Sequence, residues 1–151
     1  LVQGKRVLVT GAGGSIGAEL VRQIAGFSPA ALVLYELSEF NLYSIDYAIA
    51  EQFPALKHVP VVGDIRDGTQ LAAVMREQRP EIVFHAAAVK HVPMCEVNCD
   101  QAVLTNVGGT RTVVDACVAH GVELMVQVST DKAVNPLSVM GTTKRIAEMY
   151  A

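Results

Sequence analysis

The fold is decided by a glycine-rich turn that reads Thr10-Gly11-Ala12-Gly13-Gly14-Ser15-Ile16-Gly17. An apolar, β-branched run precedes this turn and a stretch of helical periodicity follows it, so the turn joins a strand to a helix. Gly11, Gly14 and Gly17 have the spacing Gly-x-x-Gly-x-x-Gly. The commoner dinucleotide pattern would place its third glycine at position 16, where isoleucine stands. The turn therefore predicts a variant of the loops that hold a diphosphate.

The glycines of this turn have separate expected roles. Gly11 permits the tight turn, and Gly17 lets the helix pack closely on the sheet. Gly13 and Gly14 let the backbone approach an anion, which then faces the positive N-terminal end of the helix. A glycine motif alone is also compatible with a purely structural turn. Here, however, strand, turn, helix and second strand follow in the order that a dinucleotide site requires.

The rest of the chain alternates short apolar runs with longer stretches of helical period. Strands are predicted at Arg6–Thr10, Ala31–Tyr35, His58–Val62, Ile82–His85 and Leu124–Ser129. Helices are predicted at Ser15–Ala25, Glu39–Gln52, Thr69–Gln78, Asp100–His120 and Ser138–Tyr150. This alternation is typical of an α/β fold with a doubly wound parallel sheet, the Rossmann fold, in three layers α/β/α. Since no linker or repeat divides the chain, we expect one dinucleotide-binding domain over residues 1–151.

Composition excludes several classes of protein. The 151 residues are 51% hydrophobic, which excludes wholesale disorder, and a net charge of -3 with scattered basic residues argues against a nucleic-acid partner. No apolar run approaches the roughly 20 residues of a membrane span, so we expect no membrane contact by this chain. Cys95, Cys99 and Cys117, without a secretory signal, indicate reduced thiols in a cytoplasmic domain. Because the chain starts at Leu1 and stops inside a predicted helix, we expect a fragment of a longer protein whose substrate-binding part follows it.

Acidic residues follow the second and third strands, at the edge where such a sheet binds its ligands. Glu36 lies about 20 residues after the glycine turn, where a carboxylate accepts hydrogen bonds from a ribose 2′-hydroxyl. This position favours NAD over NADP, because a 2′-phosphate would meet a like charge. Asp64 and Ile65 stand where a carboxylate and an apolar side chain can hold the edge and face of an adenine ring. The alternatives are a solvated helix start at Glu36 and a plain turn at Asp64.

Two further segments carry a family resemblance. Residues His85–Pro93 read HAAAVKHVP, and Ser129–Pro136 read STDKAVNP. With these segments the chain resembles, from Val7 to Tyr150, the UDP-N-acetylglucosamine 4,6-dehydratases of bacterial polysaccharide biosynthesis. These CapD-like lyases form a branch of the extended short-chain dehydrogenase/reductase superfamily.

The resemblance implies a reaction, a cofactor and a partner. NAD(P) would oxidise carbon 4 of a UDP-amino sugar, water would leave across carbons 5 and 6, and the hydride would return to carbon 6. The product would be a 4-keto-6-deoxy amino sugar still attached to UDP. The resemblance also implies that the whole protein is a homo-oligomer.

The resemblance assigns roles to residues at the strand ends. Cofactor contacts fall on Gly11, Gly13, Gly14, Ser15, Ile16 and Gly17 in the turn, on Glu36, Leu37, Ser38 and Asn41 after the second strand, and on Asp64, Ile65, Ala86 and Ala87 after the third and fourth strands. Lys90 matches a lysine shared between cofactor and substrate, and Lys144 matches the lysine that binds the nicotinamide ribose. Thr130 matches the hydroxyl donor to the substrate, and Asp131 and Lys132 match the acid/base pair of the elimination.

Chemistry alone gives the Asp131–Lys132 pair a reason. Loss of hydroxide from carbon 6 needs a proton donor, and loss of the proton at carbon 5 needs a base. Two adjacent opposite charges at the carboxyl end of a strand are expected to shift each other's pKa values toward the working range, and both can reach one substrate. From spacing alone, an ordinary surface ion pair is an equally good interpretation.

Met140 departs from the Tyr-x-x-x-Lys pattern of the wider superfamily, in which Lys144 supplies the lysine. Methionine cannot accept a proton, so another base must replace the phenol. We hypothesise that Asp131 or Lys132 does so, through a water held by Thr130. Within the family, a methionine at this position resembles the longer members that are anchored in the bacterial inner membrane.

Two other functions share the glycine turn. An epimerase or reductase acting on a nucleotide sugar would bind the same cofactor but would not need Asp131 beside Lys132. A non-catalytic dinucleotide sensor would also keep the turn, and Met140 would then record the loss of catalysis.

Two further site interpretations are disfavoured. His91, Cys95 and Cys99 recur every four residues, but three ligands interrupted by a proline make a poor zinc site, and we expect no metal. Ser129 and His85 lack the Gly-x-Ser-x-Gly elbow of a hydrolase.

Overall fold

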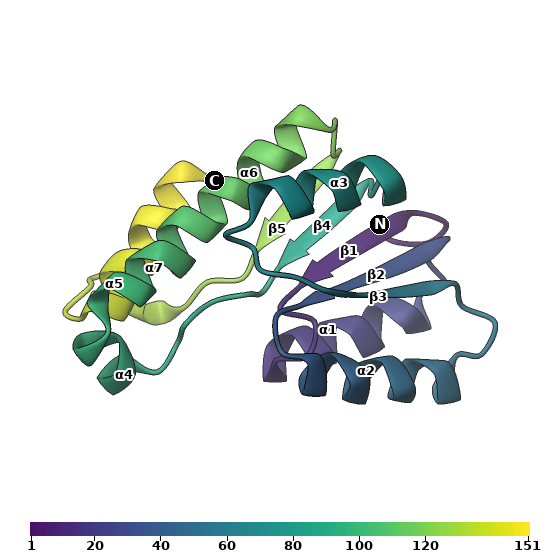
Figure 1. The fold of residues 1–151 in the computed structure, drawn as a ribbon, viewed down its shortest axis with the longest axis horizontal. Helices are drawn as coiled ribbons and strands as arrows, with labels where there is room; N and C mark the ends of the chain where they lie inside the picture. Colours follow the sequence, from purple (N-terminus) through teal and green to yellow (C-terminus); the bar gives the residue numbers. More distant parts are fainter.

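The computed structural model describes residues 1–151, and its centre is a sheet of five parallel strands (Figure 1). The strands are β1 (Arg6–Thr10), β2 (Ala31–Glu36), β3 (His58–Val62), β4 (Ile82–His85) and β5 (Leu124–Gln127). Their order across the sheet is β3-β2-β1-β4-β5, and every neighbouring pair is parallel. The predicted doubly wound parallel sheet is confirmed.

The strand order reverses at β1. After β1 the chain moves outward through β2 and β3, and it then crosses to the other side of β1 to form β4 and β5. Thr10 at the end of β1 pairs with His85 at the end of β4, so the loops that follow these two strands diverge from adjacent points. Open α/β sheets bind their ligands at such a divergence, beyond the carboxyl ends of the strands.

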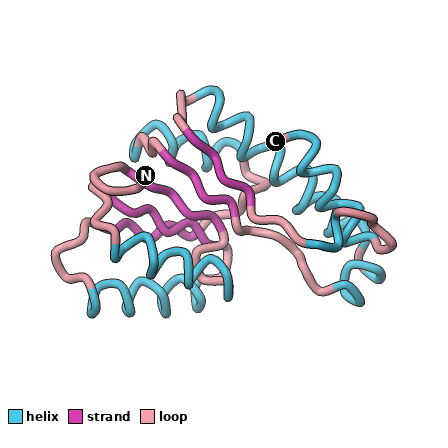
Figure 2. The backbone as a smooth tube through the Cα atoms, turned by 180° about the vertical axis from the view of Figure 1, so that it is seen from behind, coloured by secondary structure: helices cyan, strands magenta, loops and turns pink.

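Helices cover both faces of the sheet (Figures 1 and 2). One face carries α1 (Ser15–Gly26) and α2 (Glu39–Gln52), and the other carries α3 (Gly68–Gln78) and α6 (Thr110–Ala119). The remaining helical elements are α4 (Val92–Val97), α5 (Cys99–Ala102), the π-helical η1 (Val103–Gly109), the 3₁₀-helical η2 (Asp131–Ala133) and α7 (Val139–Tyr150). No helix combines the length and the apolar character that a membrane span requires.

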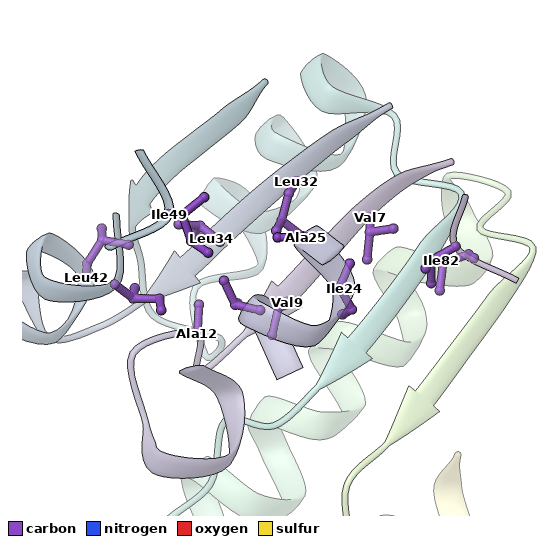
Figure 3. Packing of buried hydrophobic residues seen from close by; sticks show 13 residues of the cluster. Val7, Val9, Ala12, Ile24, Ala25, Leu32, Leu34, Leu42, Ile49 and Ile82 are labelled. Atoms are coloured by element: carbon purple, nitrogen blue, oxygen red, sulfur yellow. The ribbon is translucent and has the colours of Figure 1, made fainter. Parts of the chain in front are cut away.

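The core has two parts because side chains on a strand alternate between the faces of the sheet. Val9 and Leu34 pack beneath α1 and α2, in the cluster drawn in Figure 3. Leu8 and Val33, their neighbours along the strands, pack on the opposite face with residues of α3 and α6. This alternation confirms the three layers expected from the sequence.

The prediction of one regular helix over Asp100–His120 was wrong in detail. The helix starts at Cys99 in α5, widens into the π-helical η1 and becomes α-helical again in α6. Within η1, a Cβ on Gly109 would come within 2.5 Å of the Ile65 side chain, so glycine is required for this close approach. Such a tertiary contact is not recorded by periodicity in the sequence, and neither is the π-helical geometry of this segment.

One further helix was not predicted, and several predicted boundaries differ from the structure by one or two residues. The sequence analysis does not predict α4, because a proline normally interrupts a helix. Pro93 lies in the first turn of α4, where its missing N–H has no intrahelical partner to lose. β5 ends at Gln127 rather than Ser129. The N–H of Val128 still donates to the His85 carbonyl oxygen (2.9 Å), and the chain then turns toward η2.

A buried histidine joins three elements at the point where the loops diverge. His85 Nδ1 lies 2.6 Å from Thr10 Oγ1, and its Nε2 lies 3.0 Å from Thr110 Oγ1. A neutral imidazole satisfies both hydroxyls, since one ring nitrogen donates and the other accepts. Burial, together with the nearby charge of Lys144, lowers the pKa of His85 to about 3. The imidazole thus connects β1, β4 and α6 without carrying a charge.

We expect this histidine to make folding sensitive to acid. Because the pKa of His85 is lower in the folded state than its ordinary 6.5, the unfolded chain binds a proton first. The stabilisation is complete above about pH 6.5 and is lost toward about pH 3, with a slope of up to about 1.4 kcal/mol per pH unit. Urea denaturation at a series of pH values should show a shallower acid loss for His85→Gln than for the wild type. His120→Gln, a change at an exposed histidine, should leave the acid loss unchanged, and equal slopes for all three proteins would contradict the prediction.

Candidate functional site

A cavity of about 710 Å³ opens where the loops after β1 and β4 diverge. It brings together segments from the carboxyl ends of all five strands. The predicted site residues that line it are Gly11, Gly14, Ser15, Ile16, Gly17, Glu36, Leu37, Asp64, Ile65, Ala86, Ala87, Lys90, Thr130, Lys132, Met140 and Lys144. The predicted residues outside its lining are Gly13, Ser38, Asn41 and Asp131. One site therefore contains both the glycine turn and most of the residues assigned to chemistry.

The glycine turn is shaped by close backbone approaches. Gly11 has a φ of +66°, and a Cβ there would lie 2.7 Å from the Ala87 Cα, so the loops after β1 and β4 pass in contact. A Cβ on Gly17 would overlap the carbonyl oxygen of Gly11, which fixes how closely α1 begins beneath the turn. Both positions need glycine for the reasons expected from the sequence.

The first turn of α1 is open toward the cavity. Its N-cap is Gly14, and no side chain caps the helix, whereas the N-terminus of α2 is capped by Ser38. The first N–H groups of a helix have no intrahelical acceptor, so those of α1 are available to an anion. Ser15 and Ile16, the first residues of the helix, both line the cavity. This end of the site fits a diphosphate.

Gly13 has a different role from the one expected. Its N–H donates to Glu36 Oε2 (3.0 Å), and it does not line the cavity. A Cβ on Gly13 would lie 2.6 Å from the Asn41 Cβ, so this glycine lets the start of α2 pack against the turn. Ser38 accepts the N–H of Asn41 (3.3 Å) as the cap of α2. These three residues build the wall behind the cavity.

Glu36 is nearly buried at the end of β2 and still faces the cavity. Its second carboxylate oxygen, Oε1, accepts the N–H of Ser38 (2.9 Å) while Oε2 accepts that of Gly13. Each carboxylate oxygen has two acceptor sites, so a further donor can still bind. Two backbone N–H groups thus fix the orientation of the carboxylate, which leaves it able to accept a hydrogen bond from a hydroxyl in the cavity.

The segment after β3 forms the next part of the wall. Asp64 pairs with Arg66 (2.6 Å between Oδ2 and Nη2), and the bonds from this guanidinium lower the pKa of the Asp64 carboxyl. The Tyr35 hydroxyl donates to the Asp64 carbonyl oxygen (3.0 Å), and burial raises the pKa of Tyr35 to about 12. Ile65 is buried beneath the segment, against Gly109. Tyr35 and Arg66 also line the cavity and were not predicted as site residues.

The segment after β5 carries the predicted acid/base residues. Thr130 caps η2: its hydroxyl oxygen accepts the N–H of Lys132 (3.4 Å) and donates to Asp131 Oδ1 (3.0 Å). Lys132 Nζ lies 3.5 Å from the same carboxylate oxygen. Thr130 and Lys132 line the cavity, whereas the Asp131 side chain is 87% exposed and lies outside the lining. The Thr130 hydroxyl, and then Lys132, lower the pKa of Asp131.

Met140 and Lys144 bring α7 to the cavity. Met140 is buried against Cys95 and Ala102 and presents no group that titrates. Lys144 is also buried, and its Nζ donates to the carbonyl oxygen of Val128 (2.6 Å) at the end of β5. Burial lowers the pKa of Lys144. The lysine of the superfamily pattern is thus in place, while the phenol beside it is replaced by an apolar side chain.

Asn106, in η1, is a positioning residue that the sequence analysis missed. Its Oδ1 accepts the N–H of Val89 (2.8 Å), and its Nδ2 donates to the Val89 carbonyl oxygen (2.9 Å) and to Thr143 Oγ1 (3.0 Å). Val89 precedes Lys90, and Thr143 precedes Lys144. One buried amide therefore connects the loop that carries Lys90 to the helix α7 that carries Lys144. An asparagine inside a predicted helix was the only signal in the sequence, because helix interiors disfavour that residue.

Residues of the two disfavoured sites are separated by their contacts. The Ser129 hydroxyl donates to Glu148, and His85 is bonded to two threonine hydroxyls, so the two do not form a nucleophile–base pair. His91, Cys95 and Cys99 do not form a group of three that could hold a metal ion.

Comparison with known proteins gives a consistent result. A family model described as "Polysaccharide biosynthesis protein" matches residues 7–151. The capsular polysaccharide biosynthesis protein CapD of Staphylococcus aureus is 45% identical over 96% of this chain and 24% of its own length. A UDP-N-acetylglucosamine 4,6-dehydratase (inverting) of Campylobacter jejuni is 37% identical over 93% of this chain and 40% of its own length. The chain thus spans about a quarter to two fifths of these curated relatives.

Solved structures share the same architecture. A double mutant of DesIV, a dTDP-glucose 4,6-dehydratase from Streptomyces venezuelae solved with NAD and DAU bound, superposes with a TM-score of 0.80. It is 28% identical in sequence, and the match covers 96% of this chain and 50% of that one.

The contacts of Asn106 predict a loss of stability on truncation. Asn106→Ala leaves the N–H and carbonyl groups of Val89 without partners in a buried place, and each such group costs about 1–3 kcal/mol. We expect the free energy of unfolding, measured by urea denaturation, to fall by at least about 2 kcal/mol. Asn135→Ala, at an exposed asparagine outside the helices, should change it by less than about 0.5 kcal/mol. Similar values for the two variants would show that the buried amide does not join the Val89 loop to α7.

Proposed function

The chain belongs to the polysaccharide biosynthesis protein family, and from this membership we propose that the protein is a nucleotide-sugar dehydratase that uses NAD and acts on a UDP-amino sugar. One observation carries the proposal. A single cavity has an uncapped helix N-terminus on the β1 side and Thr130, Lys132 and Lys144 on the β5 side. A dinucleotide and a sugar bound there would lie between the anion site and the proton-transfer groups. The named activity of the Campylobacter relative and the NAD bound to the structural relative support this assignment.

The residues present fit NAD. The first-turn N–H groups of α1 would hold the diphosphate, and the fixed carboxylate of Glu36 would accept a ribose hydroxyl. Glu36 disfavours a 2′-phosphate because it presents a like charge. Lys144 would donate to the second ribose from its buried position beside Val128. The chemistry that NAD supplies when bound is the reversible uptake of a hydride from a sugar carbon.

Elimination of water from the sugar is assigned to the η2 segment. A base must take the proton from carbon 5, and an acid must protonate the hydroxyl that leaves carbon 6 as water. Asp131 and Lys132 supply these two roles as an adjacent pair that shares one hydrogen bond. Thr130 donates to one member and accepts from the backbone of the other, so it orients both.

Oxidation of the sugar hydroxyl also needs a base, and Met140 cannot supply it. We assign acceptance of this proton to Asp131 or Lys132, through a water held by the Thr130 hydroxyl. The accepting group then passes the proton to solvent, so that the pair offers one base and one acid when the elimination begins. The Thr130 hydroxyl and Lys132 lower the pKa of Asp131, away from neutral pH and not toward it as expected, so the carboxyl is ionised but is a weaker base than an unpaired carboxylate. Lys144 is less suited, because it is buried and its ammonium already donates to Val128.

Mass spectrometry of UDP-N-acetylglucosamine incubated with the whole protein and NAD tests the proposal. We expect a product that has lost one water. Lys132→Ala and Asp131→Asn should each lower the turnover number by at least about 100-fold, the usual contribution of a general acid or base. Lys57→Ala, at an exposed lysine outside the cavity, should leave it unchanged.

Other results would point to other functions. A product of unchanged mass would identify an epimerase instead. Bound NAD with no product would identify a sensor. Undiminished turnover in both Asp131→Asn and Lys132→Ala would refute the roles given to this pair.

A further inference from the structure

Arg66 is a cavity-lining residue that the proposed function does not use. It follows Asp64 and Ile65 in the turn between β3 and α3, and its side chain is 38% exposed. Its Nε and Nη2 donate to the Asp64 carboxylate (2.8 and 2.6 Å to Oδ2), and its Nη1 donates to Gln101 Oε1 (3.0 Å). Gln101 belongs to α5, which follows β4 in the chain, and it also lines the cavity. Two separate elements therefore hold one guanidinium.

These hydrogen bonds fix the orientation of the guanidinium and use only its edges. All five donors of an arginine lie in the plane of the group, so bonds to Asp64 and Gln101 are made at its edges. A planar guanidinium held by its edges can stack on an aromatic ring. Nucleic-acid-binding proteins use arginine planes in this way to hold unstacked bases.

The position of Arg66 selects the adenine half of a dinucleotide. The glycine turn after β1 occupies the middle of the site, with the segments after β2 and β3 on one side and those after β4 and β5 on the other. Lys144 and Thr130 lie on the β5 side, so the nicotinamide is expected there. Arg66 shares the opposite side with Glu36, which is placed to read the adenosine ribose. An aromatic ring beyond that ribose would be the adenine.

The charge of Arg66 is already paired. A carboxylate within 2.6 Å offsets it, and the bonds from the guanidinium keep the pKa of Asp64 low, so the pair stays ionised at neutral pH. A guanidinium whose charge is offset by a carboxylate attracts a phosphate only weakly. Its planar face can still stack on an uncharged aromatic ring. The uncapped N–H groups at the start of α1 are available to an anion instead.

The support beneath this pair is rigid. The Tyr35 hydroxyl lies within hydrogen-bond distance of two acceptors, the Asp64 carbonyl oxygen (3.0 Å) and Gln70 Oε1 (3.2 Å), which share its single proton. Gly63 leaves room for the Tyr35 ring, which a Cβ at that position would overlap. A platform fixed before binding loses little conformational freedom when a ligand arrives.

We propose that the Arg66 guanidinium, clamped between Asp64 and Gln101, is the platform on which the adenine ring of the dinucleotide stacks. The proposal rests on the proposed function only in that a dinucleotide binds this cavity. It assigns adenine recognition to the face of an arginine as well as to the edge contacts of Asp64 and Ile65.

Calorimetric titration of the whole protein, freed of nucleotide, with adenosine, AMP and nicotinamide mononucleotide tests this platform. Arg66→Ala should weaken adenosine and AMP by the same factor, about 5-fold to 100-fold, the range that stacking of a base on a side chain contributes. Arg66→Lys should be weakened similarly, because an ammonium has no plane. Gln101→Ala keeps the ion pair but releases one edge, and should show a smaller loss, of about 2-fold to 10-fold. Affinity for nicotinamide mononucleotide should be unchanged in all three variants.

The control is Arg22→Ala, which removes an arginine of α1 that is paired with Glu19 outside the cavity, and it should bind every ligand as the wild type does. Unchanged adenosine affinity in Arg66→Ala, a loss confined to AMP, or full rescue by lysine would overturn the platform, because the last two results indicate a charge contact with phosphate. An equal loss for nicotinamide mononucleotide would overturn it as well. Failure of the wild type to bind NAD would instead refute the proposed function, so the two failures are distinguishable.

Discussion

The structure depends on the close contact between the loops that leave β1 and β4. The positive φ of Gly11 and the absence of a side chain there allow its backbone to pass within contact distance of Ala87. The N–H of Ala86 donates to the Thr10 carbonyl oxygen (3.1 Å), and His85 bonds to the Thr10 hydroxyl beneath it. Since β1 is central, this contact fixes where the glycine turn lies relative to the segments after β4 and β5. The cavity exists because two loops start side by side and then diverge.

Much of the fold was predictable because it depends on local signals. β1, β3 and β4 have the predicted bounds, since each is a short apolar run flanked by residues that end a strand. The segment over residues 99–119 was less predictable. Its helical period is clear in the sequence, but its π-helical turn depends on how Asn106 and Gly109 meet residues far away in the chain. Contacts between residues so far apart in the chain produce no periodic pattern in the sequence.

The candidate site shows the same division. The glycine spacing and the Ser129–Pro136 segment identify the two ends of the cavity, because each motif is contiguous in the sequence. The contacts of Gly13 with Glu36 and α2 were not predicted, since only the packed structure shows α2 against it. Arg66 and Asn106 were missed for a related reason: their partners, Gln101 and Thr143, are 35 and 37 residues away. Contiguous motifs can be recognised in the sequence, whereas the residues that hold them in place through long-range hydrogen bonds are found only in the structure.

The replacement of a phenol by Met140 moves proton transfer from one element to another in the proposed reaction. A tyrosine on α7 would be fixed by a buried helix beside Lys144, whereas η2 is a single 3₁₀ turn whose Asp131 is largely exposed. Water around an exposed carboxylate weakens its interaction with a substrate, because charges interact strongly only where the dielectric is low. The proposed catalysis by Asp131 and Lys132 therefore requires η2 to be covered when the substrate is bound. The Thr130 hydroxyl already bonds the Asp131 carboxylate and the Lys132 N–H, so the turn is ordered before the substrate binds. Covering η2 therefore has to exclude water from Asp131 and Lys132, but it does not have to bring these two residues together.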